Sequence, residues 1–391
     1  MTIRVYLDHN ATSPLRPEVH AAMAAALAET GNASSVHAEG RSARARIETA
    51  RAAVAGLVGA APAAVTFTSG ATEAIALALS PVLELSGRPV RYDVLLVSAI
   101  EHPAVRAGGR FAADKIEIIP VDGEGRVDLS ALDAMLARHR KDGRRALVSV
   151  MAAHNETGVI EPLAEVAARV HAAEGVFHTD AVQIVGRYPF DFEASGADLI
   201  SLSSHKLGGP QGAGALIARD ADTRLPPLWR GGGQERGARA GTENVAAIAG
   251  FGAAATSAAM MAAEEVGRLA GLRDRLEDGL QDIAPEVVFL SGGAARIPNT
   301  TCFAVPGIAA ETAVIAFDLE GVALSAGAAC SSGKVGPSAA LAAMKTEPRI
   351  ARGAMRASLG WNSTETDVSR FLTVFARIHA SRRRRNRIEA A

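Results

Sequence analysis

The sequence contains few cysteines, few aromatic residues and no long hydrophobic run. Two cysteines, Cys302 and Cys330, cannot form a framework of disulfides, which excludes the disulfide-rich class of small secreted proteins. Residues 1–15 lack the apolar core of a signal peptide, so we expect a cytoplasmic protein. No apolar stretch reaches the roughly 20 residues that cross a bilayer, so the sequence predicts no membrane-spanning helix.

The sequence also has no excess of charge of either sign. Its formal net charge is -1, and charged residues make up 21% of the chain. This balance gives no electrostatic reason to expect nucleic acid or a membrane surface as the main partner, so we expect small-molecule chemistry. The arginine-rich segment 381–387 would suit an acidic partner, but at a chain end it is more typical of a solvated, mobile tail.

Lysine is scarce, because only five of the 41 basic residues are lysines. One of them, Lys206, lies in the segment SLSSHKLGGPQG. An ammonium group can lose its proton whereas a guanidinium effectively cannot, so a lysine kept here in an arginine-rich chain indicates a reacting amine. A neutral amine is a nucleophile that forms Schiff bases with carbonyl compounds, including pyridoxal phosphate. The alternative for Lys206 is a solvated loop lysine.

Short β-branched and apolar runs alternate with helical stretches and predict seven strands. The runs are residues 64–69, 93–98, 115–120, 146–151, 176–180, 198–203 and 214–219. The spacing leaves room for crossover helices, as over 70–87 and 162–175, and predicts an α/β fold with a mostly parallel sheet buried on both faces. At 391 residues two domains are expected. We assign 15–254 to a large cofactor-binding domain, and 1–14 with 255–391 to a smaller α+β domain.

Polar residues follow several predicted strands, at the edge where open α/β sheets place their active sites. Small residues and a threonine in SGATEA begin a helix, whose N-terminus can bind phosphate. Asp180 and Gln183 follow another strand, where a carboxylate can hold a pyridinium nitrogen protonated and an amide can bind the phenolic oxygen. His102 and Asn155 follow two more. Each alone could be a helix N-cap or a structural residue. Together with Lys206 they indicate a pyridoxal phosphate site.

Nucleotide binding is disfavoured by the glycine-rich segments. The sequence has no Walker lysine, and the nearest approach to a dinucleotide fingerprint, GGPQGAG, precedes a predicted strand instead of following one.

Ten motifs follow one another along nearly the whole chain. They are YLDHNATSPLRPEV, GNASSVHAEGRSAR, VTFTSGATEA, SAIEHPAV, HNETGVIEPL, HTDAVQIVGR, LSSHKLGGPQGAGAL, GGGQERGARAGTENV, ALSAGAACSS and RASLGW. In this order they resemble the class V aminotransferase family, and within it the cysteine desulfurases of the nitrogen-fixation and housekeeping iron-sulfur type. The resemblance implies the pyridoxal-phosphate fold type I, pyridoxal 5'-phosphate as cofactor, and a homodimer with active sites at the interface.

The resemblance also implies roles for individual residues. Lys206 would hold the cofactor covalently and act in catalysis with His102, which would stack on the ring. The other implied cofactor contacts are Asp180 with the pyridinium, Gln183 and Asn155 with the ring oxygen, and Ala71, Thr72, Ser203 and His205 with the phosphate. Thr242 would reach the phosphate in the partner subunit. Arg356, together with Asn155, would bind the α-carboxylate of an amino acid substrate.

The two cysteines distinguish a desulfurase from an ordinary transaminase. Cys302 lies in the strand-like TTCFAV and is expected to be a buried small hydrophobe. Cys330 lies in a run of Gly, Ala and Ser, which indicates a mobile loop. The implied reaction converts L-cysteine to L-alanine and leaves a persulfide on Cys330. An iron-sulfur scaffold or another acceptor protein would then take the sulfur. Cys330 could transiently ligate a cluster, and no permanent metal site is indicated.

Three residues depart from the family pattern and leave alternatives open. Ala326 and Ala328 stand where such loops often have serines, and His154 replaces the usual asparagine before Asn155. Loop hydrogen bonding, and with it the choice of acceptor, is therefore in doubt. The alternatives are a selenocysteine lyase, a class V aminotransferase with an incidental Cys330, and a non-catalytic scaffold. The sequence does not distinguish nitrogenase maturation, general cluster assembly and tRNA thiolation as pathways.

Overall fold

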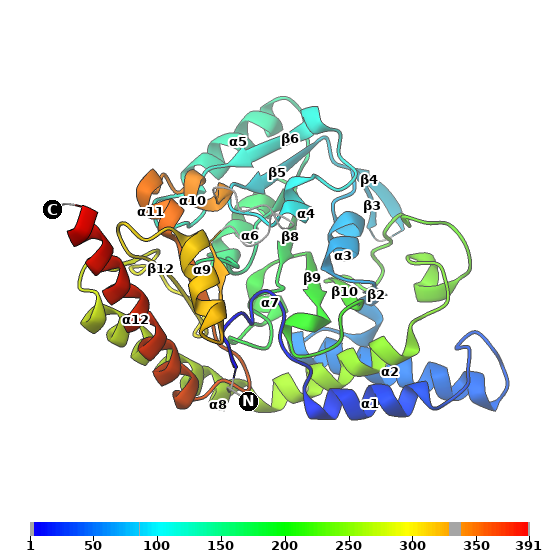
Figure 1. Ribbon diagram of the computed structural model, residues 1–391. Helices are drawn as coiled ribbons and strands as arrows, with labels where there is room; N and C mark the ends of the chain where they lie inside the picture. Colours follow the sequence, from blue (N-terminus) through cyan, green and yellow to red (C-terminus); the bar gives the residue numbers. More distant parts are fainter. Residues whose placement is uncertain (1–3, 86, 328–337, 390–391) are drawn as a thin grey trace.

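Figure 1 shows the computed structural model of the protein, which describes residues 4–85, 87–327 and 338–389. Its centre is a seven-stranded sheet in the order β2-β10-β9-β8-β7-β5-β6. The strands are β2 (Val65–Thr68), β5 (Val94–Ser98), β6 (Ile116–Ile119), β7 (Ala146–Ser149), β8 (Val176–Asp180), β9 (Leu199–Ser203) and β10 (Gly214–Ala218). Within this sheet β10 is antiparallel to both neighbours, and the remaining pairs are parallel. The predicted α/β fold with a mostly parallel seven-stranded sheet is confirmed.

Both faces of this sheet are buried under helices, which explains the nearly continuous apolar strands. The helices of this part are α1 (Pro17–Leu27), α2 (Ala38–Val58), α3 (Ala71–Ala78), α4 (Pro103–Arg106), α5 (Leu129–Lys141), α6 (Leu163–Ala172), α7 (Phe192–Ser195) and the start of α8 (Val245–Ile283). Along β5, Leu96 packs in the cluster that contains side chains of α2, α5, α6 and α8, whereas Leu95 and Val97 pack with α3 and α4. Successive side chains thus serve opposite faces.

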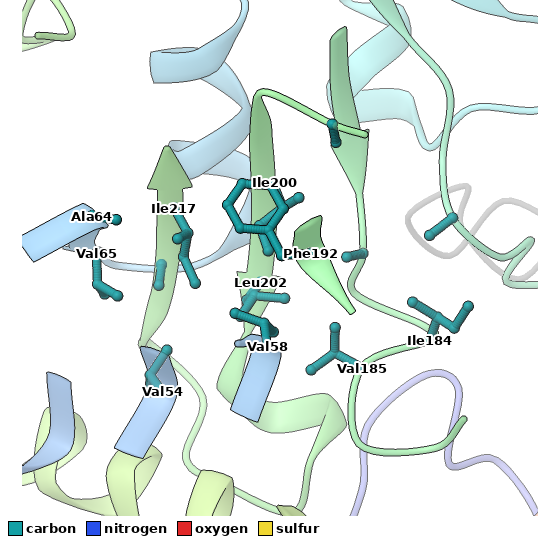
Figure 2. Packing of buried hydrophobic residues seen from close by; sticks show 14 of the residues in the cluster. Val54, Val58, Ala64, Val65, Ile184, Val185, Phe192, Ile200, Leu202 and Ile217 are labelled. Atoms are coloured by element: carbon teal, nitrogen blue, oxygen red, sulfur yellow. The ribbon is translucent and has the colours of Figure 1, made fainter. Parts of the chain in front are cut away.

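Figure 2 shows part of the cluster that contains the side chains of α2, in which Val58 of α2 lies beside Leu202 of β9. β-branched and leucine side chains fill this cluster, so a close-packed core supports the strands whose ends carry the polar residues.

A second group of elements packs around a four-stranded sheet in the order β11-β12-β15-β14. The elements are β11 (Val288–Phe289), β12 (Thr300–Ala304), β14 (Ser325–Ala326), β15 (Met355–Ser358), α9 (Ala310–Leu319), α10 (Ala339–Ala343), α11 (Pro348–Gly353) and α12 (Glu365–Glu389). The N-terminal strand β1 (Val5–Tyr6) joins this group by pairing in parallel with β13 (Val322–Ala323).

Helix α8 contributes to both groups of elements. Its residue Ala258 packs in the cluster of the large sheet, whereas Leu269 packs with β12 and α12. The assigned domain boundary between residues 254 and 255 therefore lies inside one helix, and the division into domains stays a prediction.

One local expectation from the sequence is wrong. The helix expected over 70–87 ends at Ala78, and the chain continues into a hairpin of β3 (Val82–Leu85) and β4 (Arg88–Arg91). Pro81 disfavours a helical conformation of the residue before it, which explains the end of α3. The arginine-rich segment 381–387, expected to be a solvated tail, lies in the last turns of α12, and its mobility stays a prediction.

Among the described residues no single helix has both the length and the apolar character to cross a membrane. The segments Val245–Met260 and Glu264–Ile283 of α8 meet such criteria only as a pair, with a bend of 78° between them.

The buried phenylalanines of α12 are expected to contribute strongly to stability. The Phe371 ring lies 5.2 Å from that of Phe317 and 6.1 Å from that of Phe303. Phe371→Ala should lower the free energy of unfolding by about 3 to 5 kcal/mol, because it leaves a cavity among packed rings. Leu319→Ala is the control, since Leu319 is 82% exposed. Chemical denaturation of both variants measures the difference, and equal losses would contradict the packing described.

Candidate active site

A cavity of about 610 Å³ lies at the carboxyl ends of the large sheet's strands, within the size range of small-molecule sites. Ten residues singled out from the sequence line it together: Ala71, Thr72, His102, Asn155, Asp180, Gln183, Ser203, His205, Lys206 and Arg356. They come from the ends of different strands and from β15 of the second sheet. The cavity therefore requires both groups of elements.

Lys206 lies in the 3₁₀ turn Ser204–Lys206, directly after β9. Its Nζ donates hydrogen bonds to the main-chain carbonyl oxygens of Asn10, at 2.5 Å, and Ala11, at 2.7 Å. These contacts hold the amine in the cavity against the N-terminal segment, where it can meet a ligand.

Asp180 and His102 influence each other across the cavity. Burial raises the pKa of Asp180, and the nearby His102 and Lys206 oppose this rise. Burial lowers the pKa of His102, which Asp180 raises and Lys206 lowers. The Asp180 carboxyl also accepts a hydrogen bond from the backbone N–H of Val182 at 3.0 Å. A cationic group placed beside Asp180 would favour its ionised form.

The N-terminus of α3 forms another wall of the cavity. Ala71 and Thr72 begin this helix, so their backbone N–H groups have no partner within it and can bind an anion. Gly214 of β10 lets the backbone of Gly70, which precedes α3, pack closely against it, since a Cβ at position 214 would lie 2.5 Å from the carbonyl carbon of Gly70. An anionic group is therefore the ligand that this corner favours.

His205 and Ser203 also line this cavity. The Nδ1 of His205 is 3.2 Å from the hydroxyl of Thr12. Burial, together with Lys206 and Arg187, lowers the pKa of His205 to about 4. The ring is therefore neutral at neutral pH and can donate one N–H to a ligand.

Arg356 reaches the cavity from β15 and is 1% exposed. Its guanidinium donates to the carboxylate of Asp8 at 2.6 Å and to the main-chain carbonyl of Asn155 at 2.9 Å. Within the described part of the chain, its Nε has no hydrogen-bond partner. Arg356 therefore brings a buried cation to the cavity wall, where its charge favours a carboxylate.

Sequence reasoning missed three residues of this site. Asn10 lines the cavity and donates to the main-chain carbonyl of Asn155 at 3.2 Å and the hydroxyl of Thr300 at 2.8 Å. Asp8 forms an ion pair with Arg356, and the guanidinium of Arg187 donates a hydrogen bond to the side-chain oxygen of Gln183. Asn10 and Asp8 lie in the motif YLDHNATS, and Arg187 lies in HTDAVQIVGR. The motifs therefore marked these segments, but no local pattern indicated contacts over such long sequence separations.

The remaining residues singled out from the sequence are not among the described residues that line the cavity. Thr242 is exposed and does not line it in this subunit. Cys330 and Ala328 lie outside the described residues. Ala326 lies in β14, which leads toward Cys330 along the chain. His154, which stands where the family pattern has asparagine, is buried, with Nδ1 3.0 Å from the hydroxyl of Thr157.

Cys302 is buried in β12. Burial and the nearby Glu156 raise the pKa of its thiol to about 12, against the opposing effect of arginines. Its thiol is therefore protonated at neutral pH, which makes it a poor nucleophile.

No group of three or more His, Cys, Asp or Glu side chains among the described residues is arranged to hold a metal ion.

The sequence matches the aminotransferase class-V family over residues 5–371. The chain belongs to this family. It is 42% identical over 377 residues to a cysteine desulfurase of Cereibacter sphaeroides, with 95% of this chain and 94% of the relative covered. It is 40% identical over 385 residues to the cysteine desulfurase IscS of Dictyoglomus turgidum, covering 97% of this chain and 95% of that protein. The resemblance inferred from the motifs is confirmed.

A solved structure of a NifS-like protein from Rickettsia africae matches the fold, with a TM-score of 0.86 and 34% identity over 97% of this chain and all of that chain. This likeness confirms the expected fold class.

Members of the class-V aminotransferase family use pyridoxal phosphate, and this cavity fits that group. It combines a lysine amine, a buried carboxyl group, a helix N-terminus suited to phosphate, and a volume of about 610 Å³. A cofactor with an aldehyde, a ring nitrogen and a phosphate has a complementary group for each of the three.

The charge of Lys206 should affect His102 in a measurable way. Lys206→Met removes a positive charge that lowers the pKa of His102, so that pKa should rise. Lys206→Arg keeps the charge and should leave it near the wild-type value. NMR titration of isotopically labelled histidine in the cofactor-free full-length chain measures both. His178, whose pKa is lowered by burial alone, is the internal control. An unchanged His102 in Lys206→Met would contradict the described electrostatics.

Proposed function

We propose that this chain is a pyridoxal-phosphate-dependent cysteine desulfurase that converts L-cysteine to L-alanine and carries the sulfur as a persulfide on Cys330. The observation that supports it most directly is one cavity that holds a lysine amine, a buried carboxyl group and a buried arginine. Relatives named cysteine desulfurase, similar over nearly the whole chain, support the same reaction.

In this proposal the cavity residues divide the work of holding the cofactor. Lys206 binds it covalently, Asp180 keeps its ring nitrogen protonated, and His102 stacks on the ring. The remaining contacts are Gln183 and Asn155 with the ring oxygen, and Ala71, Thr72, Ser203 and His205 with the phosphate. When bound, the cofactor acts as an electron sink for bonds at the substrate's α-carbon.

Arg356 orients the substrate by pairing with its α-carboxylate, and Asn155 borders the same place. The amine of Lys206, once free, moves the proton of the substrate's α-carbon. Because Lys206 is held by two main-chain carbonyls, its amine starts from a defined position.

The sulfur step transfers one sulfur atom without an external oxidant. The Cys330 thiolate attacks the substrate sulfur, a sulfur–sulfur bond forms, and the bond between sulfur and the β-carbon breaks with its electron pair on the carbon side. The β-carbon takes up a proton to give alanine. His102, neutral because burial lowers its pKa, is suited to accept the thiol proton of Cys330. The products, alanine and a persulfide, contain all atoms of cysteine and the Cys330 thiol.

The delivery of sulfur to an iron-sulfur scaffold or another acceptor protein is part of the proposal, as is transient cluster ligation by Cys330. We place the enzyme in the cytoplasm, where a free thiol stays reduced. We also propose a homodimer in which Thr242 of each subunit contacts the phosphate in its partner. The exposure of Thr242 outside its own cavity is compatible with this role.

The experiment that tests the proposed reaction replaces Cys330. Cys330→Ser should bind pyridoxal phosphate normally yet form no alanine from L-cysteine above background, in the presence of reductant and without a keto acid. Cys302→Ser is the matched control, and because its thiol is buried it should lose stability more than activity. Chromatographic quantification of alanine measures the effect. Wild-type alanine formation by Cys330→Ser would contradict the persulfide route and favour another β-elimination, such as selenocysteine lyase chemistry.

The role of Thr242 can be tested with mixed dimers. Thr242→Ala should weaken cofactor binding by about tenfold, the effect of one lost hydrogen bond to a charged group. In a heterodimer of one Thr242→Ala subunit and one Lys206→Ala subunit, the intact Lys206 of the Thr242→Ala subunit faces the intact Thr242 of the other subunit. Random mixing should then restore native affinity at about one quarter of all sites. Titration of covalently bound cofactor measures this fraction, and no recovery on mixing would show that Thr242 does not act across the interface.

A further inference from the structure

Arg187 is a buried cation that the proposed reaction does not use. It follows β8 by seven residues and is 7% exposed. Burial and Arg356 lower its pKa to about 10, so it is still charged at neutral pH. A buried charge is costly unless its donors are satisfied, so its contacts indicate what the charge is for.

The guanidinium of Arg187 binds only neutral oxygens in the described structure. Nη2 donates to the main-chain carbonyls of His9 and Lys206, both at 2.9 Å. Nη1 donates to the side-chain oxygen of Asn10 at 3.1 Å and to that of Gln183. Four acceptors from three separate segments thus converge on one side chain, and three of the four residues line the cavity.

These contacts form a closed loop around Lys206. Arg187 joins the Lys206 carbonyl to the segment at residues 9 and 10, and the amine of Lys206 binds the same segment through the carbonyls of Asn10 and Ala11. The main chain and the amine of Lys206 are therefore both held against the backbone of residues 9–11. The planar guanidinium can span acceptors on different segments at once, which an ammonium on a flexible stem cannot do in the same geometry.

We propose that Arg187 is a positioning residue that holds Lys206 against the N-terminal segment, so that its amine is placed for covalent attachment of the cofactor. This inference rests on the proposed role of Lys206 and adds a residue to it. Without Arg187, the carbonyls of His9 and Lys206 lose their common donor. The amine would then sample more positions, and attachment would slow even where the cavity still binds the cofactor.

The test compares attachment with simple binding in the full-length chain. Arg187→Met removes the donors but keeps much of the apolar stem. At saturating pyridoxal phosphate, borohydride trapping should show attachment slowed by about tenfold or more. Pyridoxamine phosphate has no aldehyde and cannot attach, so its affinity should change by less than about threefold, the size of a weak indirect effect. Attachment at the wild-type rate, or an equal loss in both measurements, would overturn the proposal.

Two further variants keep the result interpretable. If Arg187→Met does not fold, Arg187→Lys serves instead, because it keeps the charge but cannot join three segments; attachment should again be slowed selectively, and a wild-type rate would overturn the proposal. Arg296→Lys is the control for altering a partly buried, ion-paired arginine, since Arg296 pairs with Glu277 at 2.8 Å outside the cavity. It should leave attachment unchanged. Trapped cofactor in Lys206→Ala would instead reject the role of Lys206 itself.

Discussion

The contact between the Lys206 amine and the carbonyls of Asn10 and Ala11 is the interaction on which the site depends. It joins a turn at the end of β9 to a segment that lies 195 residues earlier in the chain. That segment in turn is anchored to the second group of elements, because β1 pairs with β13 and Asp8 pairs with Ser358 of β15. The cavity therefore forms only when both groups of elements are in place.

Several charged groups of this cavity are buried, and among the described residues not every one of them is paired with a group of opposite charge. Asp180 is buried and its pKa is raised, while two neighbouring basic groups favour its charge. Arg356 is paired with Asp8, and its Nε has no hydrogen-bond partner in the part of the chain that the structure describes. Arg187 is satisfied by neutral oxygens alone among the described residues. The Lys206 amine, Arg356 and the N-terminus of α3 suit an anionic cofactor and a substrate carboxylate.

The strands of the large sheet could be predicted because their signal is local. Each is a short apolar run buried on both faces, and each of the seven predicted runs contains an observed strand. The hairpin of β3 and β4 was missed because the apolar residues after α3 read as a continued helix. There Pro81 outweighed the pattern of apolar residues. At the end of α12, the charge of the arginine run gave no sign of secondary structure, and the segment lies in regular helix because arginine has a high helix propensity.

Much of the candidate site could be predicted, because polar residues at strand ends converge in any open α/β sheet. Lys206, Asp180 and His102 were recognisable on that basis. Arg187 and Asn10 were not, because their importance comes from hydrogen bonds between segments far apart in sequence, which leave no periodic pattern. Arg356 shows the intermediate case, since its motif was recognised while its pairing with Asp8 was not.

The central claim is that sulfur from L-cysteine passes through Cys330, and mass spectrometry after a single turnover tests it most directly. The enzyme is mixed with less than one equivalent of L-cysteine, quenched with an alkylating reagent and digested. The account predicts that the peptide containing Cys330 gains the mass of one sulfur atom, in an amount equal to the alanine released, while the peptide containing Cys302 does not. Alanine release with no added sulfur on the Cys330 peptide would contradict it.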